Sequence, residues 1–379
     1  MAAEYPKASV AGDSAFASSL YGKLAAGSGN LFFSPYSIRI ALAMTYSGAR
    51  GNTAEEMQSA LRFKLAQQQT PAALKALTDE LIADAAKDNQ KLNIANGLCL
   101  THGDVSTDFK NLLNQQFDAE IFPGLLPEIN AWVSRKTEGK IDVILRRLDP
   151  NSVCVLLNAI YFKGIWANRF EKSNTHDAPF TVSATARMTV PTMSQRNDFQ
   201  ILDWPDFQVL SMPYNGNHFS MVILLPRNVD GLAKVEKELA GLGLHSLLAQ
   251  LDATPPQKVD LAMPKYSLST GYDLVPACKA LGIKDAFDPS QADFRGMGWP
   301  KGKLWISQIK HKAFLAVDEE GTEAAAATAV EMATRGAPPV PLVFHADHPF
   351  LMLIRHNQTG SILFLGRITD PSPTPAAST

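Results

Sequence analysis

Few side chains in this sequence have the types and spacing that catalysis or metal binding requires. The local cluster His345-Ala346-Asp347-His348 holds metal-ligating groups, but it lies at a strand entrance beside Pro349, which favours a turn or packing role. The chain contains no G-x-S-x-G elbow, no H-E-x-x-H helix and no G-x-x-x-x-G-K-[ST] phosphate loop. We therefore expect no catalytic residue, no metal site, no cofactor and no enzymatic activity.

The most unusual stretch lies between residues 319 and 339, where Glu-Glu-Gly-Thr-Glu is followed by four alanines and later by a Pro-rich exit. Helix propensity would make the alanine run helical, and a flexible loop is the other ordinary interpretation. Alternation offers a third. In a strand, Glu323 and Glu331 would share one face and could point to water as the segment enters a sheet. The opposite, uncharged face would comprise Thr322, Ala324, Ala326, Thr328, Val330 and Met332.

The surrounding elements indicate α+β organisation. Helical periodicity marks the first third of the chain, in stretches 13–24, 37–46, 71–86 and 130–137. Asn52 or Thr53 can cap a helix that opens near residue 52, and Thr70 can cap the helix at 71–86. Strands follow from residue 151, and the apolar run 153–162 is long enough to be central in a sheet. A further helix is expected between Val229 and Leu251. Helices first and strands later, without βαβ alternation, are typical of the α+β class.

Composition and charge exclude several classes of function. The 379 residues include 35 Lys and Arg against 37 Asp and Glu, so the formal charge of −2 gives no nucleic-acid or membrane-surface footprint. No run approaches the length of a transmembrane helix. Cys99, Cys154 and Cys278 have no zinc-type spacing, and we expect them to be buried free thiols.

Several motifs, taken in order, resemble the serpin family along nearly the whole chain. The stretch Glu-Glu-Gly-Thr-Glu-Ala-Ala-Ala-Ala-Thr at 319–328 is similar to the hinge of inhibitory serpins. The early signature is matched by Asn-Leu-Phe-Phe-Ser-Pro-Tyr-Ser-Ile at 30–38 and Gly-Ala-Arg-Gly-Asn-Thr at 48–53. Further matches are Leu-Asn-Ala-Ile-Tyr-Phe-Lys-Gly-x-Trp at 157–166 and Phe-Leu-Gly-Arg-Ile at 364–368.

This resemblance implies a fold and a mechanism. The fold would be a single α+β domain, residues 1–370, with three β-sheets, eight to nine helices and an exposed reactive-centre loop at about 319–340. Residues 371–379 would form a disordered tail. A protease that cleaves the loop would become covalently attached, and the loop would then insert as a new strand. About 14 residues at ~3.3 Å each would carry the protease roughly 45 Å, and its distorted active site would not deacylate. The hinge residues would be Glu319, Gly321, Thr322, Glu323, Ala324, Ala325, Ala326, Ala327 and Thr328.

The position of the cleaved bond is set by the family's spacing between the hinge glycine and the bait residue. Counting from Gly321 reaches Arg335, so the bait bond would be Arg335–Gly336. Arginine is the side chain that an acidic primary pocket selects, which makes a trypsin-like serine protease the expected partner. Met332 is a second candidate bait for other proteases, and Arg335 as an ordinary solvated loop residue is the remaining interpretation.

The resemblance also implies two polar clusters that would control the sheet. The shutter, beneath the opening, would comprise Ser34, Ser37, Asn158 and His311. The breach, where the loop first enters, would comprise Trp166, Lys265 and Glu319. Buried polar groups can exchange hydrogen bonds as strands part, and a Lys265–Glu319 pair could hold the sheet closed. Each residue also has an ordinary interpretation, such as helix cap for Ser34 and core histidine for His311.

Other properties complete the sequence-based expectations. The helix at 71–86 carries one base, Lys75, against several acids, so we expect no heparin site; we also expect a monomer. The first residues lack the basic start and apolar stretch that are typical of a signal peptide. The resemblance slightly favours an extracellular or periplasmic protein whose signal was removed, with the cytoplasm as the alternative. A non-inhibitory serpin (carrier, chaperone or storage protein) is the second functional hypothesis, although such members usually break the hinge with charged or bulky residues.

Overall fold

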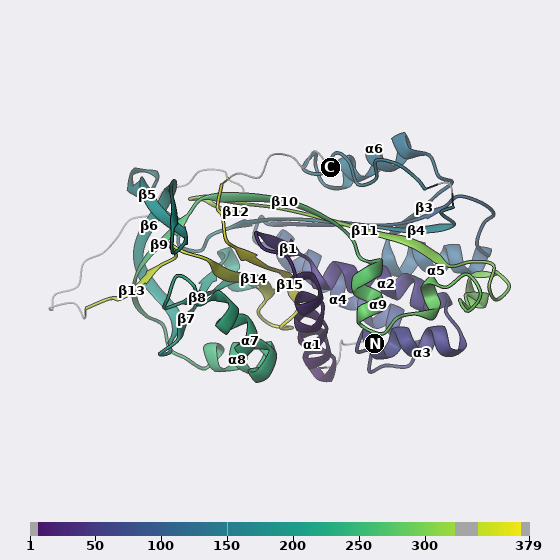
Figure 1. Ribbon diagram of the computed structural model, residues 1–379, viewed down its shortest axis with the longest axis horizontal. Coiled ribbons are helices and arrows are strands. Elements are labelled where there is room, and N and C mark those ends of the chain that lie inside the picture. Colours follow the sequence, from purple (N-terminus) through teal and green to yellow (C-terminus); the bar gives the residue numbers. More distant parts are fainter. Residues whose placement is uncertain (1–6, 150, 323–339, 373–379) are drawn as a thin grey trace.

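The computed structural model describes residues 7–149, 151–322 and 340–372. Figure 1 shows an elongated molecule in which the long strands β10, β11 and β4 run along the long axis. These strands belong to a six-stranded sheet, ordered β10 (Tyr266–Asp273), β11 (Ile306–Val317), β4 (Cys154–Ile165), β2 (Lys91–Leu100) and β3 (Ala119–Phe122), with β12 (Gly321–Thr322) paired to β4. The predicted central strand at 153–162 is therefore confirmed as β4.

The other strands follow a nine-stranded path that changes direction at β6 (Ala186–Asp203). This strand pairs with β9 over Thr192–Phe199 and with β7 over Gln200–Asp203, so the path divides into two hydrogen-bonded sheets. With the six-stranded sheet this makes three. The path is β1 (Leu31–Phe33), β15 (Ile362–Ile368), β14 (Phe350–His356), β8 (Phe219–Pro226), β7 (Phe207–Pro213), β6, β9 (Gln257–Pro264) and β13 (Leu342–His345), with β5 (Thr175–Ser183) paired to β6.

Nine α-helices surround the sheets in the described part of the chain. Figure 1 shows α6 across one face of the six-stranded sheet and α2, α4 and α5 against the other. Within the described residues, no helix has both the length and the apolarity needed to span a bilayer. The helices are α1 (Lys7–Leu24), α2 (Pro35–Gly48), α3 (Gly51–Ala60), α4 (Thr70–Lys87), α5 (Thr107–Phe117), α6 (Leu126–Lys136), α7 (Leu232–Leu242), α8 (Leu244–Asp252) and α9 (Val275–Ala280).

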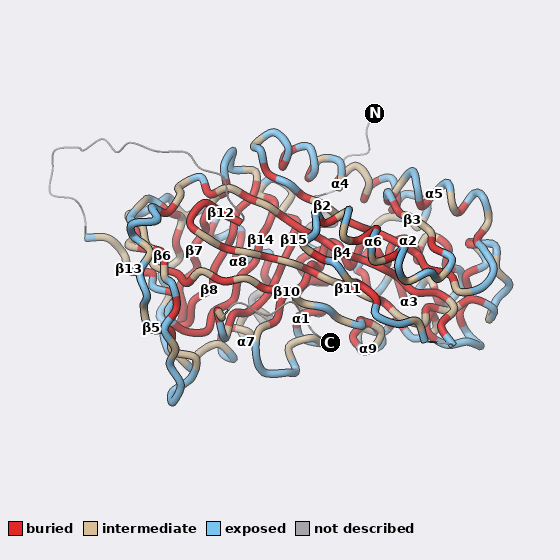
Figure 2. Tube along the Cα trace, turned by 90° about the horizontal axis from the view of Figure 1, so that it is seen from above, coloured by how far each residue is buried: buried red, intermediate tan, exposed pale blue. Residues whose placement is uncertain are grey.

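The core lies where α2 passes behind β4. Figure 2 shows buried chain along the middle of the molecule and exposed chain at its rim. Pro35 occupies the first turn of α2, and the Ser34 hydroxyl accepts a hydrogen bond from the Ser37 amide (3.0 Å), so the cap expected for Ser34 is confirmed. Because nearly every residue of α2 is buried, its polar side chains must find partners inside the protein.

Two other expected caps are wrong. Helix α3 begins after Arg50, so neither Asn52 nor Thr53 is its N-cap. The Asn52 amide donates instead to Asp285 Oδ2 (2.7 Å), because a tertiary partner is within reach. Thr70 lies inside α4, where its hydroxyl donates to a carbonyl of the preceding turn (3.0 Å). In both places a neighbouring acceptor competes with the capping geometry.

The helix expected between Val229 and Leu251 is in fact two helices, α7 and α8. Gly243, whose φ of 77° suits a residue without a side chain, separates them. Helix α5 was not anticipated, although three buried residues at helical spacing signal it: Phe109, Leu113 and Phe117. The three cysteines are unpaired and buried, as expected. Residues 373–379, for which we predicted disorder, lie outside the described residues.

Candidate functional site

The hinge begins at the end of β4, where this strand stops pairing with β11. The two strands run parallel from Cys154 opposite Ile306 to Tyr161 opposite Phe314. Beyond that point β12 takes the place of β11, with Gly321 opposite Ile165 and Thr322 opposite Gly164 in antiparallel register. The first residues of the hinge are therefore already strand-paired to β4.

Gly321 is the residue that permits this close approach. Its φ is 149°, and a Cβ atom at this position would lie 2.1 Å from the carbonyl oxygen of Gly164. Asp318 supports the preceding turn, because its Oδ1 accepts from the amides of Glu320 (3.0 Å) and Gly321 (3.3 Å). A side chain at 321 would push β12 away from β4.

Thr322 points into the protein. It is fully buried, and its hydroxyl lies 2.9 Å from the hydroxyl of Tyr214. Thr322 is also the first member of the uncharged face predicted from alternation, so that face begins on the inward side as expected. The other members of this face lie outside the described residues, as do Glu323, Ala325 and Ala327.

Glu319 and Lys265 form the ion pair that the resemblance implies. Lys265 Nζ lies 2.7 Å and 2.9 Å from the two carboxylate oxygens of Glu319, and the Thr175 hydroxyl donates to Oε1 (2.8 Å). The Glu319 side chain is only 7% exposed. Burial alone would raise the pKa of Glu319, but the hydrogen bonds from Lys265 and Thr175 outweigh it and leave the pKa lowered. The carboxylate is therefore charged at neutral pH.

Trp166, which directly follows β4, donates two hydrogen bonds to the turn at residues 318–320. Its indole Nε1 donates to the Asp318 carbonyl (3.0 Å), and its backbone amide donates to the Glu320 carbonyl (3.0 Å). The indole stacks on Tyr214 with ring centroids 4.5 Å apart and an interplanar angle of 9°. Trp166, Lys265 and Glu319 thus surround the point at which β12 meets β4.

A second, fully buried polar network lies deeper, between β4, β11 and α2. His311 Nδ1 lies 2.6 Å from Asn158 Oδ1, and the Ser34 amide donates to His311 Nε2 (3.1 Å). Asn158 Nδ2 in turn donates to the Ser37 hydroxyl (2.7 Å) and to Asn96 Oδ1 (2.9 Å). The structure therefore connects all four residues assigned to the shutter, Ser34, Ser37, Asn158 and His311.

The hydrogen bonds fix the protonation of His311. Because Nε2 accepts from the Ser34 amide, Nδ1 must carry the proton that is donated to Asn158. Burial lowers the pKa of His311 to about 3, so the imidazole is neutral at physiological pH. The neutral imidazole of His311, with one donor and one acceptor nitrogen, joins β11 to β4 and to the start of α2.

A family model described as serpin (serine protease inhibitor) matches residues 11–371. The chain belongs to the serpin family. It is 38% identical to Serpin B6 of Macaca fascicularis over 360 residues, which cover 90% of this chain and 93% of that protein. It is also 38% identical to leukocyte elastase inhibitor of Xenopus laevis over 373 residues, with the same two shares. Target proteases are therefore the partners that the family implies.

Solved serpin structures share this fold. The native state of the thermophilic serpin tengpin aligns with a TM-score of 0.86 and 28% identity over 95% of this chain and 94% of that one. Human thyroxine-binding globulin, solved with thyroxine, aligns with a TM-score of 0.85 and 31% identity over 97% and 99% of the two chains. The predicted α+β serpin fold is confirmed, and the nine helices in the described part of the chain agree with the expected eight to nine.

Sequence reasoning missed several residues that complete the serpin site. Asn96 extends the shutter network, and its Nδ2 donates to a buried carbonyl at the end of α5 (3.2 Å). Lys172 Nζ pairs with Glu320 Oε1 (2.9 Å) beside the breach. Asn96 was missed because it lies in β2, a strand that the sequence pattern did not suggest. Other residues missed are Tyr214, Thr175, Asp318 and Gly164.

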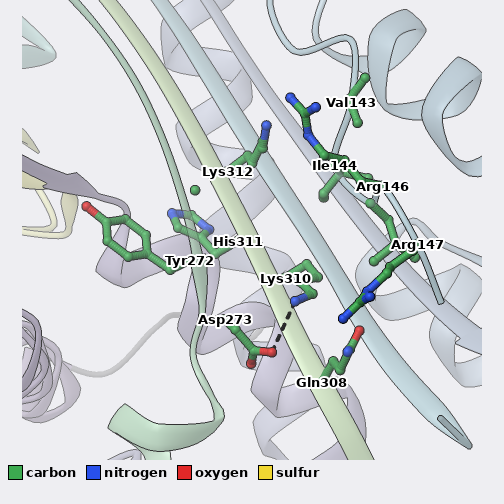
Figure 3. Close-up of a pocket in the computed structure, with 12 residues that line it drawn as sticks. Val143, Ile144, Arg146, Arg147, Tyr272, Asp273, Gln308, Lys310, His311 and Lys312 are labelled. Carbon is green, nitrogen blue, oxygen red and sulfur yellow. Dashed lines mark hydrogen bonds and ion pairs between the residues drawn. The ribbon is translucent and has the colours of Figure 1, made fainter. Parts of the chain in front are cut away.

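Figure 3 shows the other face of β11, where a basic groove of about 490 Å³ lies. Arg146, Arg147, Lys310 and Lys312 all line this groove, whereas His311 turns toward Tyr272, as strand alternation requires. Lys310 pairs with Asp273 (3.1 Å) at the edge of the groove. Burial, with the charge of Arg146, lowers the pKa of Lys312. One strand thus presents lysines on one face and the shutter imidazole on the other.

Two sets of predicted residues remain, the bait residues and the His345–His348 cluster. The bait bond Arg335–Gly336 and Met332 lie outside the described residues, so their assignment stays a prediction. In the cluster rejected as a metal site, His348 Nδ1 contacts Asp347 Oδ1 (2.7 Å) and Nε2 contacts the Pro226 carbonyl (2.8 Å). Both ring nitrogens of His348 therefore lie within hydrogen-bond distance of oxygen atoms of the protein.

Proposed function

We propose that this serpin inhibits a trypsin-like serine protease by covalent trapping at Arg335–Gly336, followed by insertion of the loop between β4 and β11. The observation that carries the proposal is the position of β12. Gly321 and Thr322 already pair with β4 in antiparallel register at the point where β11 separates from it. Continued pairing in this direction would place the loop between the two strands.

The parallel contact between β4 and β11 supports this route. The two strands are neighbours from Cys154 and Ile306 to Tyr161 and Phe314. A loop strand inserted antiparallel to both would replace one parallel ladder by two antiparallel ladders, which are slightly more stable per residue. Small, uncharged side chains from Thr322 to Thr328 would fit on the buried face. The inserted state would therefore be more stable than the uninserted state by the free energy of the added β-pairing.

The choice of protease rests on Arg335 alone. An arginine at the bait position suits an acidic primary pocket. The Xenopus relative is named for leukocyte elastase, but that name belongs to that protein, and Met332 is the residue here that a different protease would select. We infer in addition that the chain performs no catalysis of its own, needs no cofactor or heparin-type activator and acts as a monomer.

We infer that the cytoplasm is the better-supported compartment. Cys99, Cys154 and Cys278 are all unpaired thiols, which is the usual state in a reducing compartment. The exported alternative, slightly preferred from the sequence, gains no such support. Burial raises the pKa of Cys99 to about 11, so this thiol is protonated and unreactive at neutral pH.

A carrier role is the second candidate function, because thyroxine-binding globulin is solved with its ligand on the same fold. The two candidates differ in the products that remain after cleavage. An inhibitor would give a covalent complex with trypsin that survives a denaturing gel, at the summed mass. A carrier would give only a cleaved chain and a released C-terminal fragment.

Two substitutions of opposite parity test the insertion step. Ala326→Arg would place an unpaired guanidinium on the buried face, at a cost of several kcal/mol, so we expect a loss of complex of at least about tenfold in favour of plain cleavage. Ala325→Arg, on the opposite face, is the matched control and should still form complex. Equal complex formation by Ala326→Arg and Ala325→Arg would overturn the insertion step.

A third substitution tests the bait assignment. Arg335→Ala should abolish rapid reaction with trypsin, and an unchanged rate would overturn the assignment.

A further inference from the structure

A compact cluster of one carboxylate and two imidazoles lies far from the hinge and has no part in the proposed inhibition. Asp84 is near the end of α4, His218 immediately precedes β8, and His356 is the last residue of β14. Asp84 and His356 are buried, and His218 is 30% exposed. Three elements remote in the sequence thus present potential ligands to one point, which explains why no sequence motif indicates a site here.

Two of the three distances between the ligand atoms are those of a first coordination sphere. Asp84 Oδ2 lies 3.1 Å from His356 Nε2 and 3.3 Å from His218 Nδ1. All three atoms lie within 4.8 Å of one another. Adjacent ligands in a tetrahedral zinc site, with bonds of about 2.0–2.1 Å, are roughly 3.3 Å apart. Two of the three separations already match, and the partly exposed His218 can turn slightly to close the third.

The far side of His356 is fixed by a hydroxyl. His356 Nδ1 lies 2.9 Å from Thr359 Oγ1, and this hydroxyl donates its own hydrogen to Ser361 Oγ (3.0 Å). The Thr359 backbone amide also donates to Nδ1 (3.4 Å), so both polar groups of Thr359 hold the ring and orient Nε2 toward Asp84. Burial lowers the pKa of His356, although Asp84 opposes the effect. A proton lies between Nε2 and Asp84 Oδ2, which are 3.1 Å apart, and a metal ion would take its place.

The far side of His218 faces an unused acid. His218 Nε2 lies 3.9 Å from Asp88 Oδ2, and this buried oxygen has no hydrogen-bond partner among the described residues. If Nδ1 coordinates a metal, Nε2 must carry the proton, and a small turn of the ring would bring it within hydrogen-bond reach of Asp88. Both imidazoles therefore have an outer partner for the nitrogen that does not coordinate, as metal-ligating histidines almost always do.

We propose that Asp84, His218 and His356 bind a divalent transition-metal ion of the zinc class, with water as the fourth ligand. Two imidazole nitrogens and one carboxylate oxygen suit Zn²⁺ and disfavour the all-oxygen ions Ca²⁺ and Mg²⁺. Lys87 pairs with Oδ1 of Asp84 (2.6 Å) and leaves Oδ2 for the metal. The bound ion joins α4 to β8 and β14.

The test is a zinc titration of untagged, chelator-treated protein by isothermal calorimetry, with Co²⁺ absorption as a second readout. We expect one saturable site and a rise in the thermal midpoint with zinc but not with Mg²⁺. His218→Ala removes a partly exposed ligand, so the variant should fold while its zinc affinity falls by at least about tenfold, since even outer-shell changes cost 10–100-fold. Cobalt should give the intense visible bands of a tetrahedral site in the wild type and lose them in the variant.

Two further variants make the outcome unambiguous. His345→Ala is the matched control, because His345 also lies near an aspartate (3.9 Å from Asp260) yet belongs to no such cluster among the described residues; it should bind zinc as the wild type does. Asp88→Asn should weaken zinc binding without removing a ligand. No saturable zinc binding by the wild type, or equal affinity in His218→Ala, would show that the cluster is a hydrogen-bond network only and would overturn the proposal.

Discussion

At the scale of single residues, the hinge depends on a charge that the protein keeps almost out of water. Glu319 is buried, and its pKa is lowered because Lys265 and Thr175 both donate to the carboxylate. A buried carboxylate that loses its ionic partner is far more costly than an exposed one. The sequence located this pair only through the family resemblance, since a Lys and a Glu that lie 54 positions apart show no local pattern.

We predict that Lys265→Ala loosens the turn before β12. The change leaves Glu319 buried without its main partner, which should lower the free energy of unfolding by about 1–3 kcal/mol. Heat-induced polymerisation should be faster, as measured by native gel or light scattering. The difference from the wild type should shrink as pH falls through the lowered pKa of Glu319, because the protonated acid no longer needs the lysine.

The control for this change is Lys75→Ala. Lys75 pairs with Asp79 on the exposed side of α4, with both side chains largely in water. Exposed ion pairs contribute little, so the effect should stay within about 0.5 kcal/mol. Polymerisation of Lys265→Ala at the rate of Lys75→Ala would contradict the role assigned to the breach pair.

At the scale of elements, apolar runs in the sequence predicted helices and strands correctly, whereas a strand with polar residues was missed. The run at 153–162 predicted β4, and the helical stretch at 37–46 predicted α2, because both elements are buried on all sides. Strand β2 was missed because its first half alternates weakly, and its function is to carry Asn96 into the shutter. For the two-residue strand β12 the alternation from Thr322 onward indicated a strand, but its partner β4 lies too far away in the sequence to be identified by that pattern.

We predict that Gly321→Ala displaces β12 from β4. The new Cβ would lie 2.1 Å from the Gly164 carbonyl, and its backbone φ of 149° is one that side chains rarely adopt. The native state should lose about 1–3 kcal/mol, and exchange of the Trp166 amide, which donates to the Glu320 carbonyl, should accelerate. Gly282→Ala is a useful comparison, because it has a positive φ but open space around it. Unchanged exchange at Trp166 in Gly321→Ala would contradict the docked hinge.

At the scale of the whole molecule, the neutral imidazole of His311 links the two halves of the six-stranded sheet. It joins β11 to Asn158 in β4 and to Ser34 at the start of α2. A proton on Nε2 would remove the acceptor for the Ser34 amide. The network is therefore compatible with the closed sheet only while the ring stays uncharged.

We predict that acid weakens the native state through this residue. The pKa of His311 is about 3 in the folded chain against 6.5 for a free histidine, so the unfolded state binds more protons between these values. Stability contributed by the neutral ring is complete above pH 6.5 and is lost as pH falls, by about 1–2 kcal/mol from pH 7 to pH 5. His311→Gln should remove that part of the pH dependence in urea titrations. An identical pH slope in the variant and the wild type would contradict it.

The order of strands in the nine-stranded path has a consequence for synthesis. Strands β14 and β15, the last two of the chain's described strands, lie between β1 near the N-terminus and β8 in the middle. A chain still on the ribosome therefore cannot close this sheet until residues 350–368 have emerged. Such high contact order slows folding. All strands of the six-stranded sheet precede β14 in the sequence. This sheet can therefore form before β14 and β15 complete the nine-stranded path.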